Sequence, residues 1–217
     1  MRDKKYDLIL SDLGNVLVNF DHKIAVRKIL EHASKREQDI YQLFFDSGLT
    51  KFYEEGKINS IDFFHRVQHA LELDIDYKTF WPIWNDIFFE TPLNIKFQDF
   101  LRSIKGSYKL VMISNISKSH FEFLKKKMPI FNEFDKLVLS YEVGFRKPAP
   151  EIYKIALESF NIPASKAFYI DDREDLIEAS SKMGIRGICF NGEDAFKEIK
   201  KELDITNVDL NRCLEFL

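Results

Sequence analysis

Short apolar runs alternate with amphipathic stretches along much of this chain. The run at 8–10 precedes the polar sequence SDLGN, and similar runs lie at 110–113, 137–139, 167–170 and 185–190. Their length and flanking turn residues are typical of buried strands. Helices are expected at 95–104, 117–128, 152–160, 176–183 and 194–203. This alternation predicts an α/β fold, in which a Rossmann-like parallel sheet is flanked by helices.

The segment from about 20 to 90 has helical rather than strand spacing throughout. Four helices are expected there. Asn59 or Ser60 caps the third, and Pro82 fits the first turn of the fourth, which extends from Tyr77 to Phe89. The apolar positions of the first three are Ile24, Ile29 and Leu30; Ile40, Leu43 and Phe44; and Ile61, Phe64, Val67 and Leu71. We therefore predict a core domain at 1–19 and 91–217, with an all-helical domain at 20–90 inserted after the first strand.

Composition and charge narrow the functional classes. The chain has 217 residues, of which 45% are hydrophobic and 31% charged, and this is globular composition. A formal net charge of -3 gives no reason to expect a nucleic acid or a membrane as partner, and the N-terminal apolar run is too short for a signal peptide. Cys189 and Cys213 form neither a disulfide framework nor a metal-binding spacing, so we expect a cytoplasmic protein. Nothing indicates an oligomeric state.

Four polar clusters follow predicted strands. They are Asp12, Ser114–Asn115, Lys147 and Asp171–Asp172. Because parallel strands end at the same edge of a sheet, we expect these clusters to converge. Adjacent carboxylates repel unless a cation lies between them, and oxygen ligands suit Mg²⁺. A hydroxyl, an amide and a lysine suit a phosphate, so the set indicates phosphoryl transfer through an aspartyl-phosphate.

In this order, the four motifs resemble those of the haloacid dehalogenase (HAD) superfamily, in the subgroup with a helical cap inserted after the first motif. The motifs are DLGNVL, the SN of VMISNIS, the lysine of GFRKPAPEIY and the acidic pair of FYIDDREDL. The resemblance covers about residues 6 to 190. The wording of DLGNVL and RKPAPEIY looks closest to a bacterial branch that includes small sugar-phosphate phosphatases acting on glucose 1-phosphate.

The resemblance implies a Mg²⁺-dependent phosphatase for a small phosphate ester, whose leaving group is read by the cap. It assigns the nucleophile to Asp12 and the neutralisation of charge to Lys147. The implied metal ligands are the Asp12 carboxylate, the Gly14 carbonyl and Asp172, with Asp171 direct or through water. Ser114, Asn115 and Lys147 are the implied substrate-binding residues.

One departure from the family pattern concerns Gly14. Most phosphatases of this family have a second Asp there as general acid and base, a group whose loss costs about 10²–10⁴-fold in rate. Three outcomes are open. The enzyme is slow or prefers good leaving groups such as an anomeric phosphate. Asp21 or His22 replaces the missing acid and base, or turnover is lost. Since the DLGN variant occurs in active members of the resembling branch, we favour a working enzyme.

Two alternative functions stay open. Because Gly14 lacks the acid and base group, the chain could be a catalytically weak phosphate-binding or regulatory protein. A haloacid dehalogenase uses the same nucleophile, but does not need the metal site that the acidic pair indicates.

Several residues in the helical segment have two readings. Tyr53, Glu54 and Lys57 lie near an expected turn and are interpreted as surface residues, with contact to the substrate as the alternative. Trp81 and Trp84 are interpreted as packing residues, again with substrate contact as the alternative.

Overall fold

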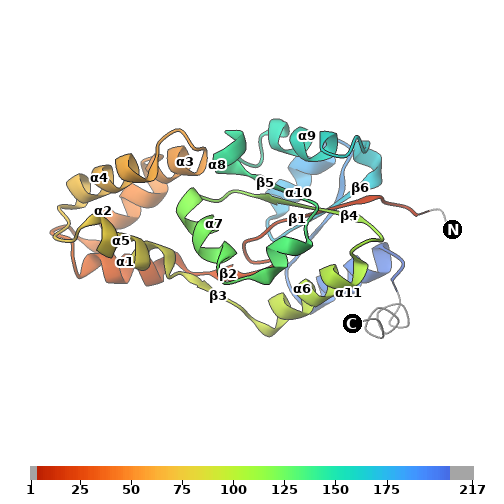
Figure 1. Cartoon of the computed structure of the whole chain (residues 1–217), viewed down its shortest axis with the longest axis horizontal. Helices are drawn as coiled ribbons and strands as arrows, with labels where there is room; N and C mark the ends of the chain where they lie inside the picture. The colour runs from red at the N-terminus through yellow and green to blue at the C-terminus, as the bar shows by residue number, and fades with distance from the viewer. Residues whose placement is uncertain (1–3, 206–217) are drawn as a thin grey trace.

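The computed structural model describes residues 4–205, and a five-stranded sheet forms its centre (Figure 1). The strand order is β5-β4-β1-β6-β7, and every pair of neighbours is parallel. The strands are β1 (Leu8–Ser11), β4 (Lys109–Ser114), β5 (Lys136–Leu139), β6 (Ala167–Asp171) and β7 (Arg186–Cys189). The predicted α/β class with a parallel sheet is confirmed.

Helices cover both faces of the sheet, because the buried strands are apolar on both sides. Along β1, Ile9 faces one apolar cluster while Leu8 and Leu10 face the other. The helices α6 (Pro92–Ile104), α7 (Lys118–Lys125) and α11 (Glu193–Glu202) pack on the first face, and α9 (Pro150–Glu158) and α10 (Glu174–Ser181) on the second. These helices match the expected ones to within a few residues at each end.

The helices between β2 (Asn19–Phe20) and β3 (Phe88–Phe89) form a block to one side of the sheet (Figure 1). We call residues 21–87 the helical block. A separate apolar cluster fills it, and its centre is a set of aromatic rings that includes Phe63, Phe80 and Trp84. Its elements are α1 (His22–Leu30), α2 (Glu37–Tyr41), a π-helical segment (Gln42–Asp46), α3 (Leu49–Glu54), α4 (Ser60–Leu71) and α5 (Tyr77–Asn85).

The strand β3 corrects the expectation that residues 21–89 are wholly helical. The last helix of the block ends at Asn85, and Phe88–Phe89 pairs antiparallel with Asn19–Phe20. The rings of Phe20 and Phe88 meet edge to face, with centroids 6.3 Å apart. Aromatic residues favour such paired extended segments, and this preference overrides the continuation of the helix.

Three details of the predicted helices were wrong. Asp76 caps α5, so Pro82 lies inside the helix and beyond its first turn. Ile61 is 55% exposed, because α4 buries the opposite side, with Phe63 and Phe64. The short helix α3 was not expected, since only two of its residues, Leu49 and Tyr53, are buried and they give no clear period. Asn59 caps α4, as one of the two predicted alternatives.

The helical block contacts the core through several of its residues. His120 on α7 donates from Nε2 to the Trp84 carbonyl oxygen at 3.2 Å, and their rings stack 5.3 Å apart. Burial lowers the pKa of His120 to about 3, so the imidazole is neutral. The Tyr53 hydroxyl accepts from the Ser119 N–H at 3.3 Å. Gly56 lies so close to Tyr141 that an added Cβ would be 2.2 Å from the Tyr141 carbonyl oxygen.

Within residues 4–205, no helix is long and apolar enough to cross a membrane. Cys189 is a free, half-buried thiol. Cys213, and residues 1–3 and 206–217 of the predicted core domain, lie outside the described residues.

We predict that Gly56→Ala destabilises the protein more than Gly48→Ala does. Both glycines have positive φ, +66° and +78°, so each substitution carries about 1–2 kcal/mol of left-handed backbone strain. Only at Gly56 does the new methyl group overlap another atom, and such overpacking costs about 1–3 kcal/mol more. Urea unfolding of the two variants measures the difference. Equal losses of stability would show that the block does not approach Tyr141 closely.

Candidate active site

The ends of three strands bring the predicted site residues to one edge of the sheet. Asp12 directly follows β1, Ser114 ends β4, and Asp171 ends β6 with Asp172 next to it. Lys147 lies in the loop between the short helix α8 (Ser140–Val143) and α9. All of these except Asp171 line one cavity of about 530 Å³, and Asn115 and Gly14 line it with them.

Lys147 lies between two buried carboxylates. Its Nζ is 2.8 Å from Asp12 Oδ1 and 2.6 Å from Asp171 Oδ2, and its side chain is 1% exposed. The Asn115 side chain holds this loop in place: its amide donates to the Lys147 carbonyl at 2.9 Å, and its oxygen accepts from the Lys147 N–H at 2.7 Å. Asn115 of the second motif therefore positions Lys147, the residue of the third motif.

Burial sets the charge states at this centre. It raises the pKa of Asp12 to about 7, although the Lys147 charge acts in the opposite direction. Burial alone would lower the pKa of Lys147, but the charges of Asp12 and Asp171 outweigh it, so the pKa is raised and the lysine is cationic. Desolvation also raises the pKa of Asp172, against the hydrogen bond from Asn15.

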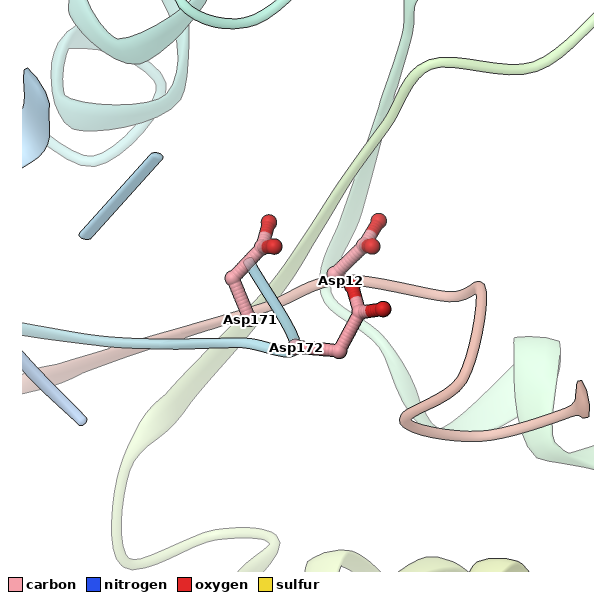
Figure 2. Close-up of side chains that lie close together, drawn as sticks. All are labelled: Asp12, Asp171 and Asp172. Carbon is pink, nitrogen blue, oxygen red and sulfur yellow. The ribbon is translucent and has the colours of Figure 1, made fainter. Parts of the chain in front are cut away.

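Three carboxylates gather within reach of one cation. Each of Asp12, Asp171 and Asp172 offers an oxygen, and these oxygens lie within 4.8 Å of one another. In Figure 2 the Asp12 and Asp171 carboxyl groups point the same way from adjacent chain segments, and Asp172 extends toward Asp12. One lysine cannot neutralise three carboxylates. The oxygen-only donor set with excess negative charge fits Mg²⁺.

The hydrogen bonds distinguish the three carboxylates. Lys147 contacts one oxygen of Asp12. The Asn15 amide donates to one oxygen of Asp172 at 2.8 Å. Asp171 has both oxygens engaged. Its Oδ1 accepts from the Arg173 N–H at 2.9 Å, and its Oδ2 from Lys147 and the Tyr169 hydroxyl. Asp12 and Asp172 therefore each have an oxygen that could bind a metal directly, whereas both Asp171 oxygens already have partners.

The space beside Gly14 is filled by an aromatic ring. A Cβ at Gly14 would lie 2.8 Å from Cε1 of Phe20, the residue that ends β2. This is the position at which the resembling family has its acid and base. Position 14 thus has no carboxyl group, and the Phe20 ring occupies the space beside it.

The helical block supplies the opposite wall of the cavity. Of the two substitutes considered for the missing acid, His22 lines the cavity, whereas the Asp21 side chain caps α1 by accepting from the Lys23 N–H. Trp84 is a packing residue that also lines the cavity. The block residues on this wall include His22, Phe45, Thr50, Lys51, Glu54 and Trp84.

Glu54 is half-buried and lines the cavity where the block meets the core, so of its two readings the structure favours the one that faces the cavity over a plain surface position. Its Oε2 is 2.8 Å from Nε of Arg146, and the Glu54 side chain is 17% exposed. Burial raises the pKa of Glu54 to about 7, although Arg146 opposes the rise. The signal available in the sequence was the position of Arg146 directly before Lys147. Tyr53 is buried within the block, and Lys57 is exposed and pairs with Glu55.

Comparison with known protein families gives one match that covers most of the chain. The model of haloacid dehalogenase-like hydrolases matches residues 6–184. The chain is 24% identical to the D-ribitol-5-phosphate phosphatase of Bacteroides thetaiotaomicron over 81% of its own length and 87% of that protein. It is 32% identical to drimenol cyclase drtB of Aspergillus calidoustus over 58% of its length, and it spans only 24% of that longer protein.

Solved structures share this architecture. A haloacid dehalogenase family enzyme of Bacteroides thetaiotaomicron, crystallised with magnesium and inorganic phosphate, aligns with a TM-score of 0.78 and 26% identity. The alignment covers 87% of this chain and 96% of the other.

We predict that the Gly14→Ala and Phe20→Leu substitutions are not additive. In the wild-type background the new methyl group at position 14 overlaps the Phe20 ring, which costs about 1–3 kcal/mol. Leucine at position 20 lacks the overlapping ring edge, so the penalty of Gly14→Ala should shrink in that background. Urea unfolding of the four proteins in a double-mutant cycle measures the coupling. Strict additivity would contradict the contact.

Proposed function

Because the chain belongs to the haloacid dehalogenase-like hydrolase family, we propose that it is a Mg²⁺-dependent phosphatase for a small phosphate ester. The observation that carries the proposal is the set of Asp12, Asp171 and Asp172 around Lys147, at the base of a cavity that Ser114 and Asn115 also line. The phosphatase that matches most of the chain, and the magnesium and phosphate in the similar crystal structure, support the same chemistry.

Asp12 is the proposed nucleophile. One of its carboxylate oxygens attacks phosphorus, the ester P–O bond breaks, and an aspartyl-phosphate forms; water then attacks phosphorus and releases Asp12. Ser114 and Asn115 bind the phosphoryl oxygens. Lys147 favours the ionised form of Asp12 and reduces its repulsion from the phosphate dianion, since its Nζ is 2.8 Å from Asp12 Oδ1.

Mg²⁺ would be held by the Asp12 carboxylate, the Gly14 carbonyl and Asp172, with Asp171 direct or through water. When bound, it supplies positive charge that stabilises the transferring phosphoryl group. Asn15 orients Asp172 for this role, because its amide binds one oxygen of that carboxylate at 2.8 Å and leaves the other for the metal.

We propose that the helical segment, residues 20–90, acts as a cap on a core formed by residues 1–19 and 91–217. The cavity supports this, because its base comes from the core and its opposite wall from the helical block. The paired strands β2 and β3 are the only backbone connections between the two parts and would act as the hinge. Closure of such a cap excludes water while the aspartyl-phosphate forms. The cytoplasmic location and the preference for glucose 1-phosphate stay predictions.

We predict that Asp12→Asn abolishes phosphate release from a panel of esters that includes a sugar 1-phosphate and an aryl phosphate. Removal of a catalytic nucleophile costs roughly 10³-fold or more, so little turnover should survive. Addition of EDTA should have the same effect on the wild-type protein, with recovery on addition of Mg²⁺. The control is Asp175→Asn, an exposed carboxylate near the acidic pair that binds Arg173.

Three results would contradict this proposal. Turnover that survives Asp12→Asn would remove Asp12 as nucleophile. If the protein binds phosphate but releases none from any ester, it is a phosphate-binding protein. If it releases halide from a 2-haloacid without a metal, it is a dehalogenase.

A further inference from the structure

The missing carboxyl at Gly14 raises the question of which group protonates the leaving oxygen. We propose that Glu54 is the general acid and base of this active site, reaching the reaction from the helical block. The inference rests on the proposed phosphatase function and adds a catalytic residue to it.

The position of Glu54 is the first argument. A second, smaller cavity of about 70 Å³ lies beside the main one, and Gly14, Ser114 and Asn115 line it together with Glu54. Glu54 also lines the main cavity. It therefore borders the space next to the proposed phosphoryl-binding residues and next to the position where the family's acid is absent.

The attachment of Glu54 is the second argument. A catalytic acid must be held in place. Glu54 is the last residue of α3, and the chain contacts the core just before and just after it: the Tyr53 hydroxyl accepts from the Ser119 N–H, and Gly56, two positions on, lies against the Tyr141 backbone. Arg146, the neighbour of Lys147, orients the carboxyl group itself through the 2.8 Å ion pair.

The charge of Glu54 is the third argument. Desolvation raises its pKa to about 7, with Arg146 acting against the rise and Glu55 adding to it. His22 is a further titratable group that lines the same cavities. A carboxyl group that titrates near neutral pH can both give and take a proton there, which general acid–base catalysis requires.

The two steps then balance. As Asp12 attacks phosphorus and the ester P–O bond breaks, the Glu54 carboxyl gives its proton to the leaving oxygen, and an alcohol departs. The Glu54 carboxylate next takes a proton from the water that attacks the aspartyl-phosphate. The P–O bond to Asp12 breaks, and the products are inorganic phosphate, the Asp12 carboxylate and protonated Glu54.

His22 fits the first step less well. Its ring packs against Phe20 and Phe45, with centroids 5.0 and 5.2 Å away. Burial lowers the pKa of His22, although the charge of Asp21 acts against this. The neutral imidazole that results is a poor proton donor to an alkoxide.

Leaving-group dependence tests the proposal. The phenolate of an aryl phosphate can leave without being protonated, whereas the alkoxide of an alkyl phosphate needs a proton from an acid. We expect Glu54→Gln to lower kcat/KM for D-ribitol 5-phosphate by about 10²–10⁴-fold, and for p-nitrophenyl phosphate by less than about 10-fold. Glu54→Asp keeps a carboxyl group and should retain part of the alkyl activity. Glu37→Gln, an exposed carboxylate of the helical block that lines neither cavity, is the control, and urea unfolding verifies that each variant folds.

Several outcomes would overturn the assignment. Equal losses on both esters in Glu54→Gln indicate a structural role for Glu54. A loss confined to the alkyl ester in His22→Gln, without one in Glu54→Gln, makes His22 the acid. A wild-type protein that hydrolyses only the aryl ester has no acid in place. The parent proposal fails separately, if the wild-type protein releases no phosphate from either ester or if Asp12→Asn is fully active.

Discussion

The contact of Lys147 with Asp12 and Asp171 is the interaction on which the site depends. A buried ion is expensive to remove from water, and loss of one partner from such a group costs about 3–5 kcal/mol. The lysine side chain is 1% exposed and reaches two carboxylates at once, so it can remain charged. Its loop is fixed in turn by both atoms of the Asn115 amide. The ion pairs of Lys147 and the Asn115 amide thus connect the ends of β1, β4 and β6 through one loop, in addition to the sheet hydrogen bonds.

The topology assigns different side chains of the cavity to the two parts of the molecule. The ends of β1, β4 and β6 place Asp12, Ser114 and the Asp171–Asp172 pair at one edge, and the loop before α9 adds Lys147. The helical block faces that edge and supplies aromatic and charged groups, Glu54 among them. The chain passes between the two parts through β2 and β3, and the contacts of Trp84, Tyr53 and Glu54 with the core hold the block against it.

Most of the core was predictable from the sequence, because short buried strands and the residues that follow them are local signals. The residues Asp12, Ser114, Asn115, Asp171 and Asp172 lie at the ends of apolar runs, and parallel topology brings such residues together. The residue Lys147 comes later in its unit, after the short helix α8. The block was harder to predict. Residue Glu54 lies on a six-residue helix with no clear period, and its burial comes from Arg146, a residue far away in the sequence. The strand at Phe88–Phe89 likewise exists only because Asn19–Phe20 pairs with it.

The ring of Phe20 beside Gly14 couples the chemistry of the site to the connection between the two parts of the molecule. The first carbon of any side chain at position 14 would lie 2.8 Å from Cε1 of Phe20, so the ring must shift to make room for it. The same ring packs on Phe88, and Phe20 pairs with Phe88 in the strands that join the helical block to the core. A substitution at position 14 therefore acts on this joint as well as on the cavity beside Asp12.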